Sequence, residues 1–232
     1  MKNSIVAIVL FISTGVGAQV SVTGGVSSLI AFGNPNPYAG IHFGLEIPRD
    51  DAVSFYGKFT HHFSQSKRSP YLGFAIANNP TNPVNPQLFD YNVKMNYNIL
   101  EGGTRYYLGN GFDYGFGAYG GTSMKLIFNS VSPDYELNDT SAVELNSEDY
   151  TVGQGYDFKG SIFSVGAGLS GGVKYSFARY GTFYLDMNID YMIFSQTSND
   201  LTLYEVYPQT GDRQWSPLIF SISLGYRKDI LW

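Results

Sequence analysis

Seven charged residues stand in segments that are otherwise apolar or rich in glycine, serine and tyrosine. They are Lys58, Glu101, Arg105, Lys174, Asp186, Asp190 and Arg227. Charges withdrawn from water must be paired, because an isolated buried charge is very costly. Lys174 and Asp186 are about equally far from a turn at Tyr180, so we expect them to face each other across one hairpin. Asp190 and Arg227 should lie on neighbouring strands at a similar depth. The set predicts a salt-bridge network that plugs a lumen; the alternative is a narrow path for protons or small ions.

The segment 60–64 contains two adjacent histidines and a His-x-Ser spacing. Ser64 could act as a nucleophile and His62 as its base, with a carboxylate still required to orient the imidazole ring. His-x-Ser on a barrel strand resembles the signature of the outer-membrane lipid A deacylases, in which Ser, His and Glu act together as an acyl hydrolase. Gln65 stands where that family has Asn, and the motif lies early in the chain instead of late. We therefore favour ordinary histidines at the rim of a barrel over a catalytic pair.

Two long polar stretches offer weaker signals. The stretch 134–157 carries seven acidic residues and no Lys or Arg, but its spacing is unlike that of a calcium-binding EF-hand, so a solvated acidic loop is the better interpretation. The stretch 79–86 is rich in proline, which removes backbone donors, so we expect an exposed loop that could contact a partner. We expect no metal site and no cofactor.

The elements that would hold these residues are β-strands. From Leu218 to Arg227, apolar residues alternate with small or polar ones, which gives a strand one apolar face and one polar face. Similar alternation recurs along the chain. It predicts eight strands near 20–33, 38–48, 52–64, 90–108, 112–129, 160–178, 182–196 and 216–231. The expected fold is therefore all-β: an eight-stranded, antiparallel, up-and-down transmembrane β-barrel.

The connections alternate in length, as they do in membrane barrels. Tight turns are expected at 49–51, 109–111 and 179–181, and long loops near 65–89, 130–159 and 197–215. In such barrels the short turns are periplasmic and the long loops external. In the fourth strand the apolar residues Met95, Tyr97 and Ile99 are expected to face outward. A bulge near Leu100 would then let Glu101 and Arg105 face inward.

Composition and the N-terminus agree with a membrane barrel. Charged residues are 14% of the chain, against about a quarter in soluble domains, whereas aromatic residues reach 16%. Residues 1–18 are expected to be a signal peptide, with the barrel domain over 19–232. No later stretch has the twenty or so apolar residues of a transmembrane helix. The net charge of −5 argues against a nucleic-acid partner.

Two phrases of the sequence carry a family resemblance: the run 100–108 followed by a tight turn, and the closing phrase 223–227 that precedes a terminal aromatic. By these phrases the chain resembles the OmpA/OmpX-type small outer-membrane barrels. It implies that Tyr226 and Trp232 belong to the strand that the outer-membrane assembly machinery reads. The signal and the Tyr/Asn/Gly-rich strands are also similar to proteins of the Bacteroidota, where small barrels often serve larger membrane machines.

These observations predict a non-enzymatic protein of the Gram-negative outer membrane. It would contact outer-membrane lipid and one or more protein partners, as a structural or accessory subunit of a secretion or barrel-assembly type of complex. The alternatives are a lipid A-modifying acyl hydrolase and a narrow pore.

Overall fold

The computed structural model describes residues 19–31, 37–77, 87–136, 150–152, 160–178, 180–197 and 217–230. Within them no helix is long and apolar enough to cross a membrane. The strands are β1 (Val20–Ala31), β2 (Tyr38–Pro48), β3 (Val53–Ala77), β4 (Gln87–Gly109), β5 (Gly115–Glu136), β6 (Tyr150–Val152), β7 (Gly160–Phe177), β8 (Gly181–Thr197) and β9 (Leu218–Ile230).

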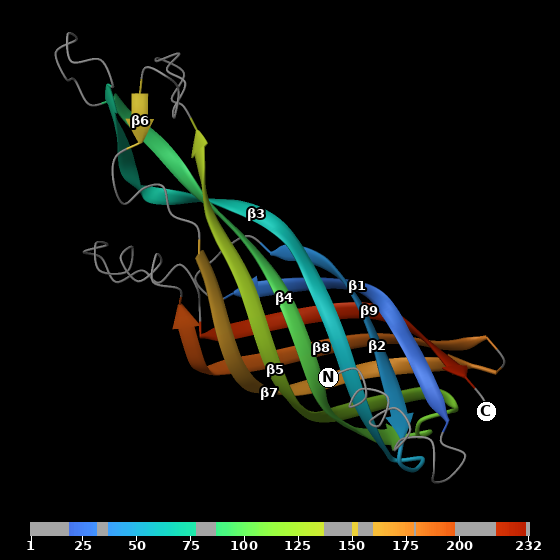
Figure 1. The fold of residues 1–232 in the computed structure, drawn as a ribbon. Coiled ribbons are helices and arrows are strands. Elements are labelled where there is room, and N and C mark those ends of the chain that lie inside the picture. Colours follow the sequence, from blue (N-terminus) through green and yellow to red (C-terminus); the bar gives the residue numbers. More distant parts are fainter. Residues whose placement is uncertain are drawn as a thin grey trace, which may run out of the picture.

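Eight of these strands close into a barrel (Figure 1). Each pairs antiparallel with its neighbours in the order β1, β2, β3, β4, β5, β7, β8 and β9, and β9 returns to β1 over Val20–Ala31. The three-residue strand β6 adds to the edge of β3 at Ala75–Ala77, outside the closed ring. The predicted eight-stranded antiparallel barrel is therefore confirmed.

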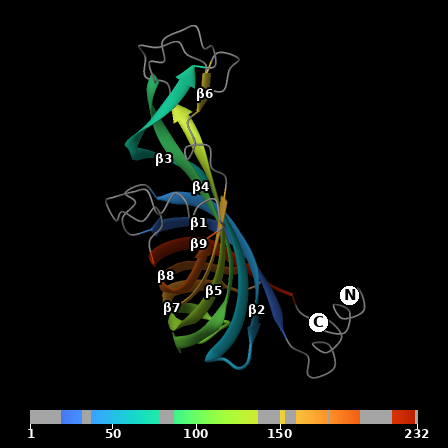
Figure 2. The same cartoon turned by 60° about the vertical axis from the view of Figure 1, so that its left-hand side comes forward.

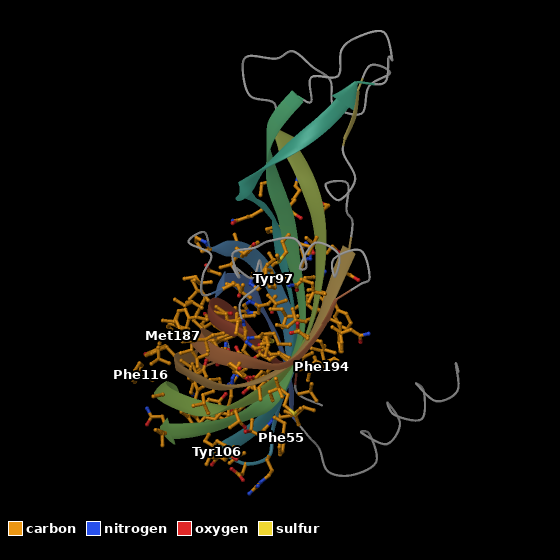
Figure 3. The ribbon with its side chains drawn as sticks, turned by 90° about the vertical axis from the view of Figure 1, so that its left-hand side faces the viewer. Phe55, Tyr97, Tyr106, Phe116, Met187 and Phe194 are labelled. Atoms are coloured by element: carbon orange, nitrogen blue, oxygen red, sulfur yellow. The ribbon has the colours of Figure 1, made fainter. Side chains whose placement is uncertain are left out.

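Side chains alternate between the interior and the outside as the sequence predicts for β7, β8 and β9. On β8, for example, Asp186, Asn188 and Asp190 are buried, whereas Met187 and Ile189 are exposed. Figure 3 shows Phe55, Tyr106, Phe116 and Met187 around the outside of the barrel. An apolar exterior around an interior that holds many charged and polar side chains is the reverse of a water-soluble fold, so the wall of the barrel faces lipid.

Three strands are much longer than the barrel needs. β3, β4 and β5 have 25, 23 and 22 residues, whereas β1 and β2 have 12 and 11. Their ends project beyond the closed ring as an extension of the same sheet, and β6 pairs at its edge (Figures 1 and 2). Much of the sequence expected to be loop near 65–89, and the start of the loop near 130–159, is therefore strand. We call this end of the barrel the loop end, and the opposite end, with the short connections, the turn end.

The prediction that Met95, Tyr97 and Ile99 of β4 face outward is wrong. Met95, Tyr97 and Ile99 are buried in the interior, in the same phase as Glu101 and Arg105. The register of β4 with β3 and with β5 runs without a shift past Leu100, so the predicted bulge is not there. The irregularity lies instead on β3, after His62. The cause of the error is that the loop-end half of the interior is lined by apolar side chains.

Candidate functional site

The interior of the barrel holds two layers of side chains. The layer at the loop end is apolar and contains Leu29, Tyr38, Met95, Tyr97, Ile127, Ile162 and Ile219, each at most 3% exposed. Tyr38 and Tyr97 meet edge to face with their ring centroids 4.8 Å apart. The second layer, towards the turn end, is built from charged side chains and tyrosines.

A chain of ion pairs runs through the second layer, and successive members carry opposite charges. Asp190 on β8 pairs with Lys125 on β5 at 2.5 Å. Lys125 also lies 3.4 Å from Glu101 on β4, which is 3.2 Å from Lys58 on β3. Lys58 reaches across to Asp186 on β8 at 3.6 Å. Each distance joins a lysine ammonium nitrogen and a carboxylate oxygen.

The series of ion pairs continues towards the turn end through two arginines. Arg105 on β4 donates to Asp186 and to Glu46 on β2, both at 2.7 Å. Glu46 lies 3.8 Å from Arg227 on β9, and Arg227 lies 3.3 Å from Asp229. Eight ion pairs of the described residues thus join nine side chains of alternating sign, from Asp190 to Asp229. We call this series the charge chain.

The eight inner members of the charge chain are withdrawn from solvent and electrically balanced. Apart from Asp229, its members are at most 4% exposed, and they comprise four carboxylates and four cationic groups. Tyrosine hydroxyls supply further hydrogen bonds, from Tyr56 to Glu101 at 2.7 Å and from Tyr119 to Asp186 at 2.9 Å. Buried ion pairs persist only where such additional partners offset the loss of water. The Arg105 guanidinium also lies 4.4 Å from the centre of the Tyr56 ring, a cation–π contact.

The structure places all seven predicted charged residues inside the barrel, but both predicted pairings are wrong. Lys174 stands opposite Tyr184 in the register, and Asp186 stands opposite Gly172. Asp190 lies opposite Ile219, far along β9 from Arg227, which stands opposite Thr182. The strands tilt and twist around the barrel, so ion pairs form across the interior between strands that are not neighbours.

Sequence reasoning missed three members of the charge chain: Asp229 at its end, and Glu46 and Lys125 within the barrel. The two within the barrel lie at inward-facing positions of an alternating segment: Glu46 follows His42 in the same phase on β2, and Lys125 follows Ser123 on β5. Their alternation with exposed Leu45 and Met124 is the signal that could have identified them.

The turn between β4 and β5 packs into the turn end of the barrel. It spans Asn110–Tyr114, longer than predicted, and Phe112 within it is 1% exposed. The Arg227 guanidinium lies 3.5 Å from the centre of the Phe112 ring. The Phe112 carbonyl accepts hydrogen bonds from Arg227 at 2.7 Å and from the Lys174 ammonium at 2.9 Å. Lys174 therefore anchors this turn instead of pairing with Asp186.

The structure does not bring His62 and Ser64 together. His62 is 1% exposed in the interior, and its Nε2 lies 3.3 Å from the hydroxyl of Ser27. Ser64 lies within the register shift of β3 and is exposed. His42 contacts the Tyr184 hydroxyl at 2.8 Å. Among the residues that the structure describes, no group of three or more His, Cys, Asp or Glu side chains could hold a metal ion.

Several predicted features lie wholly or partly outside the described residues. These are the signal peptide over 1–18, Trp232, the stretch 79–86 and most of the acidic stretch 134–157. Tyr226 is half-buried on β9, donates a hydrogen bond to the Tyr180 carbonyl, and packs against Phe183 with ring centroids 5.2 Å apart. It belongs to a group of aromatic side chains near the turn end, where amphipathic rings favour the membrane–water interface.

Solved structures with the same architecture are outer-membrane proteins. A major outer membrane protein from Thermus thermophilus is 10% identical, with a TM-score of 0.50, covering 93% of this chain and 100% of that chain. Neisserial surface protein A is 12% identical, with a TM-score of 0.47, covering 91% and 96%. Ail of Yersinia pestis, in complex with the heparin analogue sucrose octasulfate, is 9% identical, with a TM-score of 0.43, covering 92% and 100%. No protein-family model matches the sequence, and no curated protein matches it significantly.

At this level of identity the likeness concerns the fold alone. The closed ring of eight strands and the apolar outer wall describe a membrane-embedded protein in contact with lipid. Barrels of this architecture belong to the outer membrane of Gram-negative bacteria, and that is the localisation the fold indicates. The chain thus has the fold of the small eight-stranded outer-membrane β-barrels.

Proposed function

We propose that this protein is a non-enzymatic outer-membrane barrel with a plugged lumen, and that it serves as a structural or accessory subunit of a larger outer-membrane complex. The complex would be of the secretion or barrel-assembly type. The observation that carries the proposal is the position of the charge chain in the interior, between the apolar layer at one end and Phe112 at the other.

Because a plugged lumen carries no solute, the protein would act through its outer surfaces. An eight-stranded barrel is just wide enough for its own side chains, and here they form mutual ion pairs instead of lining a water-filled path. Water and ions would have to separate several buried ion pairs to pass. The surfaces that remain are the lipid-facing wall and the sheet that β3, β4 and β5 extend beyond the barrel.

The projecting sheet supports a role that involves another protein. Spanning the membrane requires strands of about 9–11 residues, yet β3 continues to Ala77, well past His62, its last pairing with β2. A sheet held by three long strands keeps its position relative to the membrane better than a loop would. Such a sheet, on the external side of the membrane, would present a fixed surface to a partner.

The proposal is tested by purification from native membranes in mild detergent, with mass spectrometry of the proteins that migrate with the barrel. We expect stoichiometric companions. A matched variant, in which residues 67–92 are replaced by a short Gly-Ser link, keeps the closed ring and should lose them. A monomeric particle without companions, from both the native and the shortened chain, would contradict the accessory role.

A further inference from the structure

The strand β8 extends past its neighbour β9 at the loop end. Its pairing with β9 ends at Tyr191. One further bond follows, from the Met192 backbone N–H to the Pro217 carbonyl at 2.7 Å. On its other side β8 stays paired with β7 as far as Thr197. Within the part of the chain that the structure describes, no strand therefore lies beside residues 193–197 on the β9 side.

This overhanging segment of β8 carries exposed apolar side chains. The register with β7 shifts between Val165 and Gly166, so that β8 has one extra residue there, Ile193. A β-bulge of this kind redirects side chains and is common at the edges of sheets. Ile193 is 71% exposed, and the next residue, Phe194, is 51% exposed. Two consecutive apolar side chains thus lie open beside this edge of the sheet.

The overhang of β8 begins where the apolar band of the barrel ends. Phe183, on the same strand, packs against Tyr226 in the aromatic group near the turn end. From Phe183 to Phe194 the distance along the barrel axis is roughly 25–28 Å, at about 3.3 Å per residue and a strand tilt of about 40°. The apolar band of outer-membrane barrels is about 25 Å tall. Phe194 and the backbone beside it therefore lie at the loop-end boundary of the lipid, where a second protein can reach them.

The other strand edges at the loop end carry residues that discourage a partner strand. Beyond its last pairing with β2, β3 contains Lys67 and Pro70. Beyond its last pairing with β7, β5 contains Pro133 and two acidic residues. Charges and prolines protect sheet edges in this way, because they oppose pairing with another strand. Residues 192–197 of β8 include neither a charge nor a proline, so this edge is open to strand addition.

We propose that an extended segment of a partner protein pairs with residues 193–197 on the β9 side of β8, antiparallel to β8 and in line with β9. The inference rests on the proposed function for one point, that the barrel has a protein partner. A row of backbone donors and acceptors is satisfied by another extended backbone, and strand addition to a sheet edge is a recurring mode of peptide recognition. The chain itself adds a strand in this way at β3, where Ala75–Ala77 pair with β6. The partner segment would be uncharged, with alternate side chains packed on Ile193 and Phe194.

The experiment places the photo-cross-linking residue p-benzoylphenylalanine at position 194 or 196 of the full chain in native outer membranes, and identifies the linked peptides by mass spectrometry. We expect both positions to link to one segment of one companion protein. Because antiparallel strands run in opposite directions, position 196 should reach a residue about two places N-terminal to the one that position 194 reaches. Links in the opposite order, or to many unrelated proteins, would overturn the proposal. Links only to residues 198–216 of the same chain, or to a second copy of it, would overturn it too.

A charge placed on this edge should weaken the pairing. Gln196→Lys keeps Ile193 and Phe194, and the link from position 194 should fall roughly fivefold relative to the amount of folded barrel. The matched control is Ser130→Lys on β5, because Ser130 is also exposed but stands opposite Ser161 in the paired sheet. The control should link as the native chain does, and equal yields from the two variants would contradict strand addition.

The outcomes separate this inference from the proposed function. Companion proteins that purify with the barrel but never link at position 194 or 196 would overturn the pairing at β8 alone. A barrel with neither companions nor links would contradict the proposed function as well.

Discussion

Arg105 connects several side chains in the interior of the barrel, not only one partner. Its guanidinium links Asp186 to Glu46 and lies over the Tyr56 ring, and its own side chain is 4% exposed. Removing one partner from a buried ion pair leaves an uncompensated charge, which is far more costly than loss of the pair as a whole.

We expect Arg105→Met to lower the free energy of unfolding by about 3–5 kcal/mol. The measurement is urea unfolding of the chain in lipid vesicles, followed by tyrosine and tryptophan fluorescence. The control is Arg49→Met at the turn between β2 and β3, where Arg49 pairs with Asp50 but is 66% exposed. An exposed pair contributes about 0–1 kcal/mol, so the control should unfold almost as the native chain does. Equal effects of the two variants would contradict the importance of the charge chain.

The stability of the fold should also depend on pH through the carboxylate of Asp50. The backbone N–H groups of Ala52 and Val53 donate to its carboxylate at 2.9 Å, and these bonds, chiefly the one from Ala52, hold the pKa of Asp50 below its ordinary value of 3.8. Because the folded pKa is lowered, the charged carboxylate stabilises the fold above pH 3.8, and this contribution is lost as the pH falls through the folded pKa.

Asp50→Asn should therefore be less stable than the native chain at neutral pH, and the difference should shrink in acid. The check is a series of unfolding curves for both proteins, from neutral pH down to strong acid. A difference that stays constant across this range would exclude a role for the ionised carboxylate.

At the scale of elements, the connection between β4 and β5 packs into the interior of the barrel as well as joining the two strands. Phe112 enters the interior, and its backbone carbonyl is held by Arg227 and Lys174. Phe112→Ala should cost about 3–5 kcal/mol, the range for truncating a buried aromatic side chain.

The matched control is Tyr114→Ala in the same turn, because Tyr114 is 75% exposed. It should change the free energy of unfolding by less than about 1 kcal/mol. Both are measured by the same urea titration. A small effect of Phe112→Ala would mean that the ion pairs alone close the turn end.

The strands show what local sequence patterns can and cannot reveal. Alternation correctly assigned the two faces of β8, where Asp186 and Met187 differ sharply in polarity. It failed on β4, because Tyr97 and Ile99 are apolar yet face an interior whose loop-end half is also apolar. It also could not pair Lys58 with Asp186, since that contact depends on the tilt of eight strands around a closed ring.

At the scale of the whole molecule, the proposed plugged lumen predicts that the protein conducts no ions across a bilayer. The native chain in planar bilayers should show no stepwise conductance. Variants that remove a single contact at the turn end, such as Lys174→Gln or Phe112→Ala, should also show no conductance, because the apolar layer and the charge chain remain. Steady channels in the native chain would contradict the plugged lumen and support a narrow pore.

The charge chain also affects how the barrel assembles. Its members lie on six strands, β2, β3, β4, β5, β8 and β9, and several of its contacts join strands that are not neighbours in the sheet. A partly paired sheet would therefore hold charges without counterions in or beside lipid, whereas the closed ring satisfies them together. Assembly should be all-or-none: the last seam, between β1 and β9, forms at the same time as the network that it encloses.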